Sequence, residues 1–329
     1  MIPRTMFDRR RVLAGLLALM AAGAGPAHAQ DNAYPSRPVK LVVGAPPGGA
    51  PDTVARLVAQ RMQLGQPVVV ENRNGAASLI ATEYVAKAPA DGYTLLLTSQ
   101  TGLAVSPIIN RSKAFDGRRD FTGVGYIGSA PLVLVAGPAL QANTVAEVIA
   151  LAKARPGALD YGNGGVGTSP YMAGALFSVM TGTKITSIPF PGEQAAMVEI
   201  MAGRLPMMFA NAASAMPHIK AGKLRGLAVT SAERVDVAQG LPTVAESGVP
   251  GFEIGTWLGV VAPAGTPGPV VTKVHEELRR VVQLPEVREA LDRLGFVHED
   301  RDLAAFNAFL RADHDKWARL IREAGIKAE

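Results

Sequence analysis

Two glycine-rich loops contain the residue types that best suit the binding of a small anion. The first loop, at residues 44–52, holds Pro46, Pro47, Gly48, Gly49 and Asp52. Glycine lets the backbone approach a ligand closely, and the free N–H groups that open a helix favour an anion. We expect Asp52 to cap the helix that follows the loop. Taken alone, the loop is equally compatible with an ordinary strand–helix turn.

The second loop, at residues 162–169, has the same character. It contains four glycines and ends in Gly167, Thr168 and Ser169. Ser169 followed by Pro170 is typical of an N-cap with proline at the first helical position. The loop lacks the lysine and the spacing of a P-loop, and it does not fit a dinucleotide-binding fingerprint. Two such loops in different halves of the chain suggest a ligand held between two lobes.

Two further polar segments follow predicted strands. Ser99, Gln100 and Thr101 come directly after an apolar run at residues 94–98. They are expected at the same sheet edge as the first loop, because ligands in open α/β sheets bind beyond the carboxyl ends of the strands. Arg73 lies in the turn after another strand, where it can pair with a carboxylate or remain a solvated turn residue.

Catalytic and metal-binding patterns are missing from the sequence. The chain has no Cys, which excludes disulfides, thiolate catalysis and cysteine-ligated metals. Neither G-x-S-x-G nor H-E-x-x-H occurs, and the five histidines are scattered without the spacing of metal ligands. We therefore expect no catalysis, no cofactor and no metal.

The elements that position these loops alternate between strand and helix patterns. Apolar runs predict strands at residues 39–44, 68–71, 94–98, 132–136, 186–189, 205–209, 224–230 and 258–262. Amphipathic stretches predict helices at residues 52–62, 78–88, 145–154, 170–180, 193–202 and 212–221. Three more helices, at residues 267–282, 286–294 and 303–324, follow around a short strand at 296–297. This order predicts an α/β fold with mainly parallel sheets flanked by helices.

The first 29 residues read as an export signal. Four arginines precede an uncharged apolar run at residues 12–24, and Ala27-His28-Ala29 fits a signal-peptidase site, so that the mature chain starts at Gln30. The run is too short to span a bilayer, which needs about 20 residues. Arg9-Arg10-Arg11 also fits a twin-arginine signal, so the export route is left open. The mature chain keeps 29 basic and 27 acidic residues, which gives no electrostatic case for nucleic acid as a partner.

Seven short motifs occur in an order that resembles one family of transport proteins. They are YPSRP (34–38), PPGG (46–49), VVVENR (68–73), ADGYT (90–94), PHIKAGKLR (217–225), LPTVAE (241–246) and APAGTP (262–267). The chain resembles the tripartite tricarboxylate transporter solute receptors, also called Bug receptors, over essentially the whole mature sequence. Each motif alone is weak, and the set together is specific.

The resemblance implies a two-lobed periplasmic binding protein fold, type II-like, that closes on its ligand. Lobe I would comprise residues 30–130 plus 256–329, and lobe II residues 131–255. Crossing strands near residues 128–131 and 251–259 would form the hinge. The resemblance also implies that the first loop and residues 167–169 hold a carboxylate through backbone amides, hydroxyls and bridging waters.

Three departures from the family pattern bear on the ligand. Ala50 and Pro51 stand where the family usually has a hydroxyl residue and a further N–H group, so contacts from the first loop would be fewer. Phe190 stands where the family has a polar aromatic, which suggests a more apolar distal pocket and an aromatic or aliphatic acid. Asn211 follows Ala210 where the family often shows an Asp, and the missing carboxylate argues against an amino-acid ligand.

These features predict a monomeric periplasmic receptor that captures a small organic carboxylate and delivers it to a membrane permease. Two alternatives use the same fold. One is a ligand-sensing partner of a membrane sensor kinase, which only the neighbouring genes would distinguish. The other is a periplasmic enzyme, which would need a nucleophile–base pair or a metal in the cleft.

Overall fold

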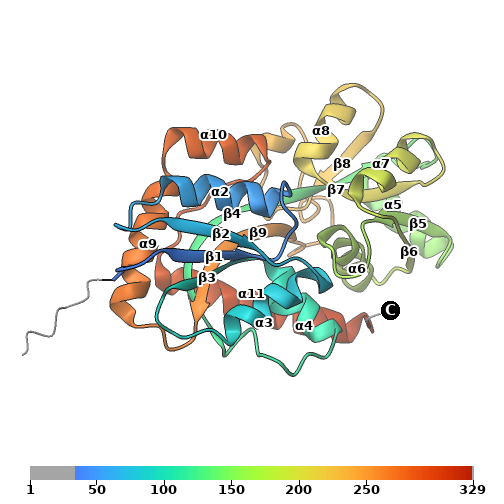
Figure 1. The fold of residues 1–329 in the computed structure, drawn as a ribbon. Helices are drawn as coiled ribbons and strands as arrows, with labels where there is room; N and C mark the ends of the chain where they lie inside the picture. Colours follow the sequence, from blue (N-terminus) through green and yellow to red (C-terminus); the bar gives the residue numbers. More distant parts are fainter. Residues whose placement is uncertain (1–33, 328–329) are drawn as a thin grey trace, which may run out of the picture. The chain divides into compact units, whose positions relative to one another are not determined.

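The computed structural model describes residues 34–327. The fold described below is that of Arg37–Glu329, the second of the two units into which the chain divides (Figure 1). The predicted export signal at residues 1–29 lies outside the described residues.

Strands and helices alternate through most of the described chain, as the sequence predicts. The strands are β1 Val39–Val43, β2 Val68–Asn72, β3 Thr94–Thr98, β4 Phe121–Ala136, β5 Leu159–Asn163, β6 Ile185–Pro189, β7 Met207–Asn211, β8 Arg225–Val229 and β9 Gly255–Pro263. The helices are α2 Ala50–Arg61, α3 Leu79–Ala86, α4 Ser106–Ile109, α5 Val145–Ala154, α6 Ser169–Thr181, α7 Glu193–Met201, α8 Ala212–Lys220, α9 Gly268–Val282, α10 Pro285–Arg293 and α11 Leu303–Glu323. Short helical turns occur at Ala76–Ser78, Thr101–Val105 and Asp236–Ala238.

The pairing of the strands is mixed, which refines the prediction of mainly parallel sheets. The strand order is β2-β1-β3-β9-β4-β7-β5-β6, with β8 also paired to β4. The pairs of β1 with β2 and β3, and of β5 with β6 and β7, are parallel. The pairs made by β4 and β9 are antiparallel. The two parallel groups are therefore joined by an antiparallel ribbon.

Strand β4 is shared between the two groups. Residues from Phe121 to Pro131 pair with β9, and residues from Leu132 to Ala136 pair with β7 and β8. The pattern predicted only the second half of this strand, because its first half contains three glycines that interrupt the apolar run. The β4–β9 pairing ends where Pro131 meets Gly255, within the two segments predicted as crossings. The division into lobes at these positions stays a prediction.

Strand β7 of the second parallel group is buried on both faces. On β7, Met207 and Phe209 belong to the core that includes α6, whereas Met208 and Ala210 belong to the core that includes α7 and α8. Alternate side chains of a strand point to opposite faces of the sheet. This double burial explains why β7 reads as a continuous apolar run in the sequence.

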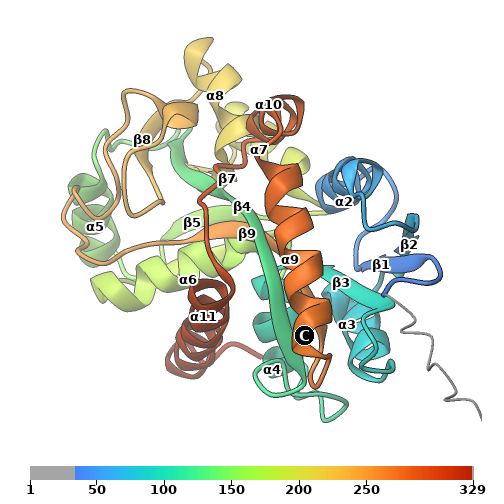
Figure 2. The same cartoon turned by 90° about the vertical axis from the view of Figure 1, so that its left-hand side faces the viewer.

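Glycines in β4 and β9 let two C-terminal helices approach the strands closely. A Cβ atom at Gly259 would lie 2.6 Å from Cζ of Phe306 on α11, and one at Gly125 would lie 2.7 Å from Cδ2 of Leu278 on α9. Figure 2 shows α9 running alongside β4, in agreement with their contacts. These glycines are therefore required for the packing of α9 and α11 against the strands.

We expect Gly259→Ala to lower the free energy of unfolding by about 1–3 kcal/mol, the usual cost of overpacking a filled core. Gly268→Ala is the matched control, because a Cβ atom at that position meets nothing within 4 Å. Urea denaturation of both variants measures the difference. Equal stability of the two variants would contradict the packing role.

Candidate functional site

The first loop is organised around the buried carboxylate of Asp52. This side chain accepts a hydrogen bond from the Gly48 N–H at 2.8 Å and one from Asn72 Nδ2 at 2.8 Å. The Arg56 guanidinium donates to both carboxylate oxygens, at 3.0 and 2.9 Å. The bond from Arg56 lowers the pKa of Asp52 to about 2, and the bonds from Gly48 and Asn72 act in the same direction. Asp52 therefore stays ionised and holds the loop in shape.

The prediction that Asp52 is the N-cap of the following helix is wrong. Helix α2 begins at Ala50, with Gly49 as N-cap and without a side-chain cap. Asp52 lies in the first turn and reaches back to the N–H of Gly48, one position before the N-cap. The Gly49 N–H donates to the Pro46 carbonyl at 3.2 Å. The N–H groups of Gly48 and Gly49 are thus used within the loop.

The outer part of the first loop is open to solvent. Pro46, Pro47 and Gly48 are exposed. Gly48 has a φ of +82°, a conformation that disfavours other residues, and no atom lies within 4 Å of where its Cβ would be. A ligand can therefore approach this backbone without displacing any side chain.

A strained segment next to the first loop was not predicted. Ala76, Ala77 and Ser78 have φ values of +46°, +49° and +71°, which are unfavourable for residues with a side chain. The Ser78 hydroxyl donates to the Gly44 carbonyl at 3.0 Å.

Gln100 is the buried member of the polar cluster after β3, with 1% of its surface exposed. Its carboxamide nitrogen donates to the Gly255 carbonyl at 2.9 Å, and its oxygen accepts from the Trp257 N–H at 3.3 Å. The side chain thereby continues the antiparallel pairing of β3 with β9. Ser99 and Thr101 on either side are half-buried.

Gln100 also brings the second loop to the first group of strands. Its nitrogen donates to the Ser169 hydroxyl at 3.0 Å, and Thr256 of β9 donates to the same oxygen at 2.7 Å. A Cβ atom at Gly167 would contact Val105 at 3.5 Å. The structure therefore brings Gln100 and the residues from Gly167 to Ser169 together. Pro46, Pro47, Gly48 and Gly49 form no hydrogen bond with that group among the described residues.

The second loop is held by its own polar groups. The fully buried Asn163 accepts from the Gly165 N–H at 2.9 Å and donates to the Ser187 hydroxyl at 2.8 Å. Thr168 donates to the Gly165 carbonyl at 2.7 Å. Thr168 is the N-cap of α6, and Ser169 is the first helical residue, so the helix begins one position earlier than the sequence predicted. Asn163 was missed because a buried asparagine cannot be distinguished from a turn asparagine by pattern.

Phe190 and Asn211 lie at the ends of β6 and β7, in the same parallel group as the second loop. Phe190 is half-buried and packs against the core that includes α7. Asn211 donates its backbone N–H to Oε1 of Glu193 at 3.0 Å and its side-chain amide to Oε2 of the same carboxylate. Burial raises the pKa of Glu193. Glu193 of α7 thus brings a carboxylate to the end of β7, where it bonds to Asn211. The expectation against an amino-acid ligand stays a prediction.

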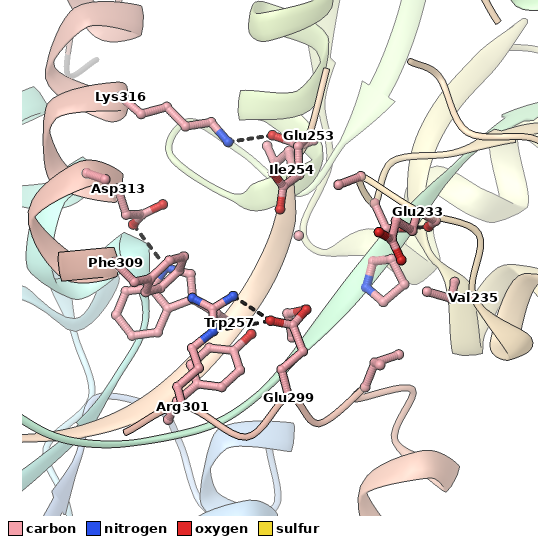
Figure 3. Close-up of a pocket in the computed structure, with 18 of the residues that line it drawn as sticks. Glu233, Val235, Glu253, Ile254, Trp257, Glu299, Arg301, Phe309, Asp313 and Lys316 are labelled. Carbon is pink, nitrogen blue, oxygen red and sulfur yellow. Dashed lines mark hydrogen bonds and ion pairs between the residues drawn. The ribbon is translucent and has the colours of Figure 1, made fainter. Parts of the chain in front are cut away.

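A separate cavity of about 710 Å³ lies beside the β4–β9 ribbon and α11 (Figure 3). None of the predicted site residues lines it. Within the described part of the chain, no helix is long and apolar enough to cross a membrane. The same part contains no group of three His, Asp or Glu side chains that could hold a metal ion.

Comparison with known families identifies the relatives of this fold and site. A sequence model described as the tripartite tricarboxylate transporter family receptor matches residues 54–326. The chain belongs to this receptor family. Its members are periplasmic solute-binding receptors and not enzymes, and this receptor shares their α/β periplasmic binding protein fold. The predicted family, fold class and non-catalytic nature are confirmed.

Three relatives illustrate the likeness. Protein BugT of Bordetella pertussis is 35% identical over 320 residues, which cover 96% of this receptor and 98% of BugT. The solved structure of Rpa4515 of R. palustris with adipate has 34% identity and a TM-score of 0.74, covering 89% of this receptor and 99% of that chain. MatC (Rpa3494) from Rhodopseudomonas palustris with bound malate has 29% identity and a TM-score of 0.71, covering 88% and 100%.

Proposed function

We propose that this receptor, exported by the signal at residues 1–29, captures a small organic carboxylate between two lobes and delivers it to the permease of a tripartite transporter. The observation that carries the proposal is the hydrogen bonding of Gln100 to Ser169, because it joins the loop region after β3 to the start of α6. Related receptors have been solved with adipate and with malate, which supports a carboxylate as the ligand class.

The proposed contacts come from the starts of two helices. The first N–H groups of α2 and α6 have no partner within their helices, and the positive ends of both helix dipoles favour an anion. At the start of α2, the proposed anion site is shaped by Pro46, Pro47, Gly48, Gly49 and Asp52. The N–H groups of Gly48 and Gly49 are already bonded within the loop. Ser169 accepts two hydrogen bonds and keeps its own O–H for a ligand oxygen.

The remaining predicted residues would form the walls of the proposed site. Phe190 would provide an apolar surface for an aliphatic or aromatic chain, and Asn211 would lie beside it at the end of β7. Ser99, Gln100 and Thr101 would border the ligand from the end of β3. The receptor is proposed to act as a monomer until its ligand-bound form docks on the permease.

A thermal-shift panel tests the ligand class. A ligand that binds only the folded protein raises its melting temperature by mass action. Aliphatic and aromatic carboxylates, amino acids and neutral sugars are compared with the mature protein, residues 30–329. We expect a shift with one class of carboxylate. Shifts with sugars alone would contradict the proposal.

The double variant Thr168→Val plus Ser169→Ala tests the proposed contacts. We expect affinity for the carboxylate that shifts the wild type to fall by at least about tenfold, since a hydrogen bond to a charged group contributes about 1.5–3 kcal/mol. Isothermal titration calorimetry measures the change. Ser178→Ala, near the other end of α6, is the matched control and should bind as the wild type does. Unchanged affinity in the double variant would remove these residues from the site.

A further inference from the structure

The cavity beside α11 lies on the face of the β4–β9 ribbon away from the proposed carboxylate site. Successive side chains of a strand point to opposite faces. On β9, the side chain of Thr256 bonds to Ser169, whereas the next side chain, Trp257, lines the cavity. The cavity is therefore a separate space of about 710 Å³, large enough for a small organic molecule.

One wall of the cavity is aromatic. Tyr126, Trp257, Phe309 and Trp317 line it. The ring of Phe309 lies 5.6 Å from that of Trp257 and 5.7 Å from that of Tyr126, both nearly edge to face. Figure 3 shows Trp257, Phe309 and Asp313 on one side of the space, with Glu233 and Val235 on the other. This wall suits a hydrocarbon chain or ring.

The cationic side chains at the cavity already have partners. Arg301 is paired with Glu299, and its guanidinium lies over the rings of Tyr126 and Phe309 at 4.5 and 4.3 Å. Arg234 is paired with Glu246 at 2.9 Å. Lys316 donates to the Glu253 backbone carbonyl. The two guanidinium groups are therefore paired with carboxylates, whereas the charge of Lys316 faces the Asp313 carboxyl on the same helix.

Two carboxylates at the cavity have no such compensation. Among the described residues, the side chains of Glu233 and Glu253 form no hydrogen bond or ion pair, and both are exposed where the cavity opens to solvent. Asp313 is buried, with 9% of its surface exposed, and only the indole N–H groups of Trp257 and Trp317 bond to it, at 2.9 and 3.0 Å. Lys316 offsets the charge of Asp313, so that Glu233 and Glu253 leave the cavity with a net negative charge.

We propose that this cavity is a second binding site, which takes an organic cation with a protonated amine and an apolar body. The amine lies near the carboxylates of Glu233 and Glu253, and the apolar body contacts Trp257 and Phe309. Both an uncompensated carboxylate and an aromatic face attract an ammonium group. The inference does not depend on the carboxylate site, because no residue is shared between them.

The intrinsic fluorescence of the protein reports on this cavity directly. The chain has two tryptophans, and both line the cavity. We expect phenethylammonium chloride to produce a saturable change in tryptophan emission with a Kd on the order of 0.1 mM. The neutral analogue 2-phenylethanol, of nearly the same shape, should bind at least about tenfold more weakly.

Charge-removing variants locate the site. Glu233→Gln and Glu253→Gln should each weaken phenethylammonium binding by about tenfold, the value of one charge-assisted hydrogen bond. Glu276→Gln, at an exposed position on α9, is the matched control and should leave the titration unchanged. Equal binding of amine and alcohol, no emission change up to about 10 mM amine, or wild-type affinity in both cavity variants would overturn the proposal.

Discussion

Replacing Asp52 with alanine is expected to lower affinity for the carboxylate ligand by at least about 30-fold and the free energy of unfolding by about 2 kcal/mol. The carboxylate is 2% exposed and accepts hydrogen bonds from Gly48, Asn72 and Arg56. Its removal leaves three partly exposed donors without this acceptor, and a hydrogen bond to a charged group contributes about 1.5–3 kcal/mol. The loop would lose its fixed shape, and ligand binding would then have to provide the free energy of ordering it.

The pH dependence of stability gives a second readout on Asp52. Its pKa is lowered from 3.8 to about 2, chiefly by the bond from Arg56. Below the ordinary value the unfolded chain binds a proton that the folded chain does not, so stability falls as the pH decreases. The contribution is fully present above about pH 4 and is lost between about pH 4 and pH 2. In Asp52→Asn this loss should be absent.

Glu83→Gln is the control for both measurements. Glu83 forms an exposed ion pair with Lys87 on α3, and such surface pairs contribute about 0.3–0.5 kcal/mol. The variant should bind the carboxylate as the wild type does. If Asp52→Ala retained wild-type affinity, the first loop would not require its internal hydrogen bonds, and its role in the site would need another explanation.

Replacing Asp313 with asparagine should remove a large pH dependence of stability, which is opposite in sign to that contributed by Asp52. Burial raises the pKa of Asp313 from 3.8 to about 6, and the indole N–H groups of Trp257 and Trp317 offset only part of this. The charged groups that face it are Lys316 on the same helix and Glu253 before β9. Between about pH 4 and pH 6 the folded protein holds a proton that the unfolded chain has released. The free energy of unfolding therefore falls by up to about 3 kcal/mol as the pH rises through this window.

Urea denaturation followed by tryptophan emission at several pH values from 4 to 7 measures this effect, as the difference between the wild type and Asp313→Asn. Asp315→Asn is the matched control, because Asp315 lies two positions further along α11 and is 56% exposed. Its stability curve should parallel that of the wild type. If the difference in the free energy of unfolding between the wild type and Asp313→Asn stayed constant across this range, the raised pKa of the buried Asp313 carboxyl would be contradicted.

Local patterns were sufficient to predict most elements and both loops. Continuous apolar runs predicted β1, β3 and β7 because strands buried on both faces carry no alternation. The two loops were predicted from their glycines and helix-start signals alone. Each loop directly follows a strand in the sequence and therefore lies at the carboxyl end of that strand. The Phe121–Pro131 half of β4 was missed, because its glycines serve the packing of α9 and α11, which follow it by more than a hundred positions.

The polar contacts that join these elements were decided by the tertiary structure. Gln100 and Ser169 are 69 positions apart, and Trp257 and Asp313 are 56 apart. Glu193 meets Asn211 only because α7 and β7 dock on the same sheet, and the cavity beside α11 exists only where that helix crosses the β4–β9 ribbon. Each of these side chains has many chemically equivalent partners along the chain, and no periodicity links one to another. Sequence by itself therefore determined the strands, the helices and the two loops, whereas the pairing of distant polar groups depended on how those elements pack.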